Sequence, residues 1–136
     1  MPPSPHMLSI KKLWPFLLLP LLIAGCTTTP ASFTNLTPQD QLRNANNLYP
    51  VEVAFNSRQQ TLRWDSVRPS VVIGTDFFPM KQTPLMKNRY ETLVPIPPGN
   101  KVVYYRFRID YDYTGFGKPG TNSTLSDVYR IQVIDK

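Results

Sequence analysis

The alternation between Lys101 and Tyr113 is the strictest constraint that this sequence places on its fold. Apolar side chains occupy every second position of the segment: Val103, Tyr105, Phe107, Ile109 and Tyr111. The positions between them hold mainly polar and charged side chains: Val102, Tyr104, Arg106, Arg108, Asp110 and Asp112. Successive side chains of a β-strand point to opposite faces. The segment is therefore predicted to be a central strand with one buried face.

Further segments carry strand patterns and together indicate an all-β chain. They are residues 32–36, 49–56, 60–64 as a continuation of the preceding strand, 67–73, 90–96 and 128–134. Pro69 indicates a sheet edge or a start delayed to Ser70, because proline cannot donate to a ladder. Leu62 and Trp64 are expected on the apolar side of their segment, in the core.

The intervening stretches are rich in Pro, Gly, Asn, Gln and Ser and are predicted as loops and turns. They are residues 37–48, 74–88, 97–100 and 114–126. About seven short strands with turns at intervals of roughly 8–12 residues are typical of an antiparallel β-sandwich or a barrel.

An apolar segment near the N-terminus has the features of a secretory signal. Lys11 and Lys12 precede an apolar stretch, residues 13–24, which Pro15 and Pro20 interrupt. As a helix this stretch would span about 18 Å. A hydrocarbon core of about 30 Å needs a helix of roughly 20 residues, so the stretch is too short to cross it. We therefore expect an export signal rather than a membrane-spanning helix.

The segment Leu22-Ile23-Ala24-Gly25-Cys26 resembles the lipobox of bacterial lipoproteins. The resemblance implies a signal peptide over residues 1–25 (with Met7 as an alternative start), acylation of Cys26, and a lipidated tether over residues 26–31. Two or more acyl chains anchor a protein firmly, whereas one alone is marginal. Thr27, in place of Asp, favours the outer membrane in bacteria that have two membranes. The alternative is a plain secretory signal with an incidental cysteine.

Composition narrows the chemistry of the part that follows Cys26. The chain has 15 Lys+Arg and 9 Asp+Glu, one Cys and one His. Two lysines leave with the signal, so the net charge falls to about +4, which suits anionic envelope polymers or lipid head groups; the alternative is an ordinary solvated surface with a modest charge excess. A nucleic acid is not expected, because the domain is exported and has no basic run. His6 leaves with the signal too, and lipidation would occupy Cys26. Ser-His-Asp or Cys-His catalysis and His- or Cys-ligated zinc are thereby excluded, so we expect no enzyme and no cofactor.

Three segments carry a family resemblance: Arg89–Pro95, the Pro97-Pro98-Gly99 turn, and Tyr104–Phe107. In this order they resemble the immunoglobulin-like domains of bacterial envelope lipoproteins, and also early-set carbohydrate-binding modules. The resemblance implies an immunoglobulin-like β-sandwich over residues 32–136. The expected function is a structural or interaction role with an envelope protein or polysaccharide, and the alternative is a surface carbohydrate-binding module. The chain departs from true immunoglobulin domains in having no paired cysteines, and from starch-binding modules in having no obvious pair of exposed tryptophans.

Four aromatic residues in predicted loops are candidates for a ligand site: Phe77, Phe78, Tyr113 and Phe116. Flat apolar rings beside hydrogen-bonding groups suit the stacking of sugar rings. The alternative is that these aromatics cover the ends of the sandwich core.

Asp110 and Asp112 lie on one face of the central strand, about 6–7 Å apart by the strand rise. The pair could suit glycoside hydrolysis or begin a calcium loop, but Thr121 stands where such a loop needs a glutamate. A calcium site of another kind, using both carboxylates and loop carbonyls, stays open. The alternative is a ladder of charges with Arg106 and Arg108, and we expect no metal site.

Overall fold

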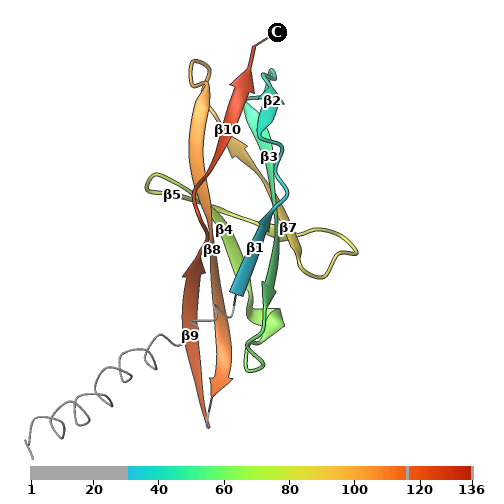
Figure 1. Ribbon diagram of the computed structural model, residues 1–136, viewed down its shortest axis with the longest axis vertical. Helices are drawn as coiled ribbons and strands as arrows, with labels where there is room; N and C mark the ends of the chain where they lie inside the picture. The colour runs from blue at the N-terminus through green and yellow to red at the C-terminus, as the bar shows by residue number, and fades with distance from the viewer. Residues whose placement is uncertain (1–30, 116, 136) are drawn as a thin grey trace, which may run out of the picture.

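The computed structural model describes residues 31–115 and 117–135. The expected signal peptide, Cys26, the expected tether up to residue 30, Phe116 and Lys136 lie outside the described residues. The described chain is an elongated sandwich of strands with a single 3₁₀ turn (Figure 1). The predicted all-β class is confirmed.

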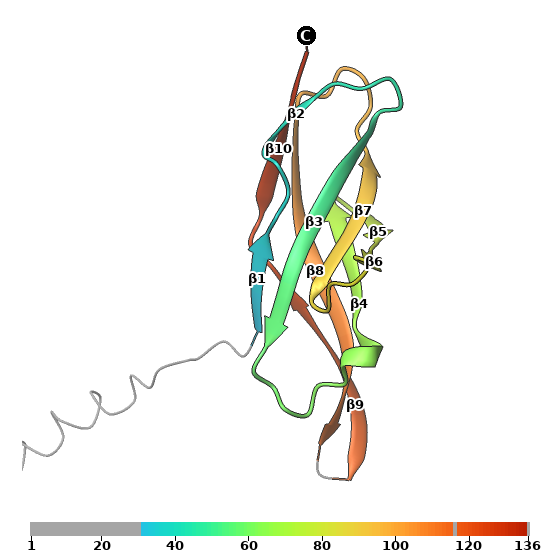
Figure 2. The ribbon, with the colours of Figure 1, turned by 90° about the vertical axis from the view of Figure 1, so that its right-hand side faces the viewer.

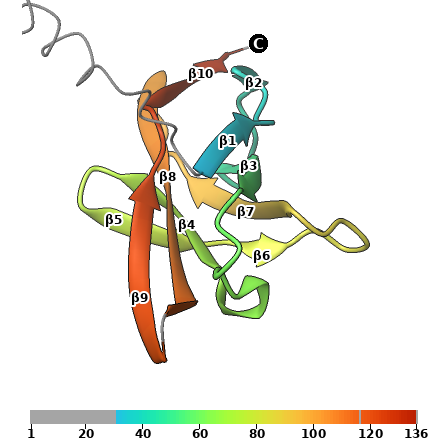
Figure 3. The ribbon, with the colours of Figure 1, turned by 60° about the horizontal axis from the view of Figure 1, so that its bottom comes forward.

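Two sheets form the sandwich. The smaller sheet has the order β1 (Ala31–Asn35), β3 (Leu48–Ser57), β7 (Arg89–Pro95) and β6 (Lys81–Gln82). The larger sheet has the order β2 (Asp40–Leu42), β10 (Tyr129–Ile134), β8 (Val102–Gly115), β4 (Arg68–Ile73) and β5 (Asp76–Pro79), with β9 (Lys118–Leu125) paired to the end of β8. Figure 3 shows the two layers from one end.

The strand order is that of an immunoglobulin-like sandwich. Taking β1, β3, β4, β6, β7, β8 and β10 as strands A to G gives the sheets A-B-E-D and G-F-C. The approximate number of seven strands is thus confirmed for the framework, and β2, β5 and β9 are added to it. The pairs are antiparallel except for β2 with β10, which run parallel.

The alternation of β8 divides its side chains as predicted. Tyr105, Phe107, Ile109 and Tyr111 are buried, and they pack with the inward residues of β3, which are also buried. Phe107 lies at the centre of an aromatic cluster, with its ring 5.6 Å from that of Tyr105 and 5.8 Å from that of Tyr129. The core therefore lies between β3 and β8.

The segment 60–64 is not a strand, so that prediction is wrong. Leu62 is buried and forms an isolated bridge to Tyr113, but the chain then turns into the 3₁₀ turn Trp64–Ser66. Trp64 is 41% exposed rather than part of the core. The backbone N–H of Arg63 donates to Asp112 O at 3.0 Å, which holds this turn against the side of β8.

Pro69 lies in a strand that has neighbours on both sides, contrary to the expected edge position. β4 starts at Arg68 and runs between β8 and β5. The carbonyl of Pro69 accepts from the N–H of Met80 at 2.9 Å, so its nitrogen also points away from β8. The missing N–H therefore removes no bond to β8.

Strands also occupy parts of the three long predicted loops. β2 lies within residues 37–48, β5 and β6 within 74–88, and β9 within 114–126. Among the residues that the structure describes, no helix is long and apolar enough to span a membrane.

Candidate functional site

The outward face of the larger sheet gathers aromatic and basic side chains from three strands, β5, β8 and β10. Strand pairing sets Tyr104 opposite Arg130, and it sets Arg106 in one row with Val72 and Phe77. Arg108 follows two residues further along the same side of β8. We call Tyr104, Arg106, Arg108, Arg130 and Phe77 the outward patch.

Two aromatic rings of the outward patch are open to solvent. Phe77 is 53% exposed and Tyr104 is 61% exposed. The guanidinium carbon of Arg108 lies 5.6 Å from the centroid of the Phe77 ring, which is a cation–π distance. The patch therefore presents flat apolar area beside guanidinium donors.

Two acidic groups on this face, Asp110 and Asp112, are already paired with arginines. Arg108 Nε donates to Asp110 at 3.1 Å, and Arg68 Nη2 donates to Asp112 at 3.3 Å. The hydrogen bond from Arg68, and then one from Thr121 Oγ1, lower the pKa of Asp112 below its usual value. Within residues 31–115 and 117–135, Arg106 has no carboxylate at ion-pair distance. The patch is therefore electropositive, which suits an acidic partner.

Asp110 and Asp112 form the charge ladder that was the alternative to a calcium or hydrolase site, although the ladder uses Arg68 and Arg108 and not Arg106. In the described part of the chain no three residues among His, Cys, Asp and Glu gather as a metal ion would require. Each carboxylate would have to break its ion pair with an arginine before it could bind calcium or take part in hydrolysis.

The four aromatic candidates do not form one platform. Phe77 and Phe78 are successive residues of β5, so they point to opposite faces; Phe78 is partly buried against the core. Tyr113 also packs against the core, on the inward side of β8. Phe116 lies outside the described residues. Phe77 alone among the described three is open enough to meet a ligand.

Tyr104 and Arg106 were not singled out as site residues in the sequence. The signal was present, because an aromatic and two arginines shared the outward face of the predicted central strand. Tyr104 and Arg106 lie near Phe77 and Arg130 only because β8 pairs with β4 and β10. This pairing cannot be deduced from the sequence pattern.

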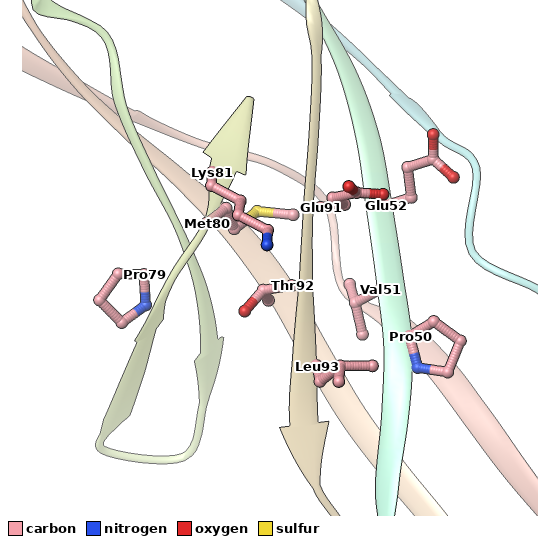
Figure 4. Close-up of a pocket in the computed structure, with 9 residues that line it drawn as sticks. All are labelled: Pro50, Val51, Glu52, Pro79, Met80, Lys81, Glu91, Thr92 and Leu93. Atoms are coloured by element: carbon pink, nitrogen blue, oxygen red, sulfur yellow. The ribbon is translucent and has the colours of Figure 1, made fainter. Parts of the chain in front are cut away.

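A second concave region lies on the smaller sheet and is an open pocket of 670 Å³. Figure 4 shows that its lining comes from β3, β7, the end of β5, the start of β6 and the residue between these two strands: Pro50, Val51, Glu52, Pro79, Met80, Lys81, Glu91, Thr92 and Leu93. Glu91 lies between Glu52 and Lys81 in one cross-strand row. Glu52 also accepts from Arg89 at 2.5 Å. The charges of this pocket are thus largely balanced within it.

No protein-family model matches the chain, and no curated protein matches it. A solved structure of murine CRIg is similar to 77% of this chain and 98% of that chain, with 9% sequence identity and a TM-score of 0.39. A similarity at this level does not show what the chain binds.

Proposed function

We propose that this chain is a lipid-anchored protein of the bacterial cell envelope, placed at the outer membrane, whose sandwich domain has a non-catalytic interaction role. The lipobox resemblance at Cys26 supports the anchor. Thr27 after the cysteine supports the choice of membrane. The immunoglobulin-like strand order supports an interaction domain, because such scaffolds carry their function in surface sites rather than in the fold.

The single observation that carries the interaction role is the outward patch. Tyrosine and arginine are the side chains most often found at the energetic centres of protein interfaces. Tyr104 and Phe77 are open to solvent, and Arg106 brings a positive charge that no described carboxylate neutralises. The partner that fits best is an envelope protein with an acidic surface.

The patch is tested by recovery of partners from the native envelope with the lipidated protein. We expect a partner that binds the wild type to be lost with the double variant Tyr104→Ala and Arg106→Glu. Lys87→Glu is the matched control, since it makes the same charge change at an exposed site outside the patch. Equal recovery by the double variant and the wild type would contradict this role of the patch.

The anchor is tested by metabolic labelling with a fatty acid. Wild-type protein is expected to take up label and to sediment with membranes. Cys26→Ser is expected to lose the label and to appear in the soluble fraction. A Cys26→Ser protein that still sediments with membranes and still carries label would overturn the lipobox interpretation.

A surface carbohydrate-binding module is the second candidate, and the exposure of Phe77 and Tyr104 on one face favours it. Rings of this kind stack on sugars. Binding of a neutral oligosaccharide that is lost in Phe77→Ala and Tyr104→Ala, yet retained in Arg106→Gln, would favour this function over the recognition of an acidic protein.

A further inference from the structure

The N-terminal start of the sandwich and the tip of its longest hairpin lie in the same half of the molecule. Ala31 opens β1 and pairs with Ser57, the last residue of β3. The connection that follows β3 bonds to the far part of β8, where Thr114 N–H donates to Thr61 O at 3.0 Å. Figures 1 and 2 show the start of β1, the 3₁₀ turn and the β8–β9 hairpin in the same half of the molecule, with the end of β10 at the other end.

Aromatic contacts connect β1 to the 3₁₀ turn at this end. The ring of Phe33 lies 5.3 Å from that of Phe55, which lies 6.0 Å from that of Trp64. Trp64 nevertheless keeps 41% of its surface exposed. A tryptophan with one packed side and one open side is the type of residue that prefers a membrane–water interface.

Exposed basic side chains lie in the same half of the molecule as the start of β1. Arg58 follows β3, and Lys118 opens β9 beside the hairpin tip; both are exposed. Arg63 is also there and is paired with Asp65 at 3.4 Å. We call Arg58, Trp64 and Lys118 the anchor-proximal surface. Basic side chains near a bilayer are attracted to anionic head groups.

The length of chain between the lipidation site and β1 is short. Four residues lie between Cys26 and Ala31, and the five residue steps from one to the other span at most about 18 Å when the chain is fully extended. An acylated Cys26 would therefore hold the start of β1 close to the bilayer, whatever path the tether takes.

We propose that the anchor-proximal surface rests against the lipid bilayer that holds Cys26, with Trp64 at the interface and Arg58 and Lys118 facing anionic head groups. This inference rests on the proposed lipid anchor. It also places the outward patch away from the bilayer, because β8 runs toward the hairpin from its start near Tyr104. Tyr104 and Tyr113 are nine positions apart on β8, which is roughly 30 Å along the strand.

Trp64 itself reports this arrangement. The chain has two tryptophans, and the other, Trp14, leaves with the signal. The lipidated protein is reconstituted into vesicles of phosphatidylcholine and phosphatidylglycerol with brominated acyl chains, which quench tryptophan on close approach. Trp64 is expected to lose most of its fluorescence relative to vesicles without bromine. The matched control is Trp64→Phe with Leu48→Trp, which moves the tryptophan to the far end of β3 and is expected to lose almost none.

Flotation of the vesicles separates the two possible failures. Lipidated protein that floats while Trp64 stays unquenched would overturn the orientation and leave the anchor intact. Protein that floats no better than Cys26→Ser would overturn both. Circular dichroism confirms that the control variant is folded before its fluorescence is compared.

Charge reversal tests the basic part of the surface. Arg58→Glu with Lys118→Glu is expected to reduce Trp64 quenching in vesicles that contain phosphatidylglycerol, and to change it little in pure phosphatidylcholine. Lys101→Glu, an exposed lysine before β8 at the opposite end, serves as the control and is expected to behave as wild type. The role of the two basic residues would be contradicted if the double variant and Lys101→Glu reduced Trp64 quenching equally. It would also be contradicted if the double variant left quenching unchanged in both lipids.

Discussion

The phenol ring of Tyr113 lies directly over the backbone of Gly120, its cross-strand partner in the β8–β9 hairpin. A Cβ atom at position 120 would come within 2.4 Å of Tyr113 Cζ and 2.5 Å of its Oη. Glycine is therefore needed here for space. The contact explains why Tyr113 is half-buried in a hairpin that extends past the main body of the sandwich.

Gly120→Ala is expected to destabilise the domain. The added methyl must displace the Tyr113 ring, and overpacking of this kind costs about 1–3 kcal/mol. Chemical denaturation followed by fluorescence measures the change. In a Tyr113→Ala background the same substitution should cost much less; equal costs in both backgrounds would show that the ring is not the obstacle.

Gln41→Met should be more damaging than its position in a short edge strand suggests. Gln41 is the buried polar residue of β2, and its Nε2 donates to Pro38 O and Pro50 O, both at 3.1 Å. Since Pro50 belongs to β3, one of these bonds links the two sheets. Methionine keeps the volume but leaves both carbonyls without this donor, at a cost of about 1–3 kcal/mol. Gln60→Met, at an exposed position, is the control, and an equal loss in both variants would contradict the role of the two bonds.

Asp112→Asn should remove a pH dependence of stability. Arg68 lowers the pKa of Asp112 in the folded state. The ionised Asp112 therefore stabilises the folded protein at pH values above the pKa of an ordinary aspartate. This stabilisation is lost as the pH falls through the lowered pKa of Asp112 in the folded protein. Thermal melts should show the variant below wild type at neutral pH and level with it once the pH has fallen below the lowered pKa of Asp112. A difference in melting temperature that stays constant from neutral to acidic pH would contradict this role of Asp112. Arg68→Gln should show the same loss of pH dependence.

Calcium is expected to leave the melting midpoint unchanged. Asp110 and Asp112 are each paired with an arginine, and in the described chain no group of three His, Cys, Asp or Glu side chains gathers around them. Melts at millimolar calcium, with magnesium as the control, test this. A rise that depends on calcium concentration and disappears in Asp112→Asn would establish the calcium site that the sequence left open.

The central strand was predictable because its pattern is long and its two faces differ chemically. Burial of Phe107 and exposure of Arg106 follow from the alternation alone. The same reasoning failed at Trp64, because the chain enters a 3₁₀ turn there. Alternate residues share a face only while the backbone stays extended.

The edge strands could not be predicted by the same means. In β9 nearly every side chain is polar or small and neither face is buried, so the strand exists through its backbone pairing with β8. β2 has three residues, too few for any period to show. The outward patch was missed for a related reason, since Arg106 and Phe77 become neighbours only through β4.

The first two strands give the domain a mechanical property. β1 pairs with β3 in the smaller sheet, whereas β2, only a few residues later, runs parallel to β10 in the larger one. The start of β1 and the end of β10 lie in opposite halves of the long axis (Figure 1). Tension along that axis would load the hydrogen bonds of each pair in shear, so that the bonds within a pair are loaded together instead of being opened one after another.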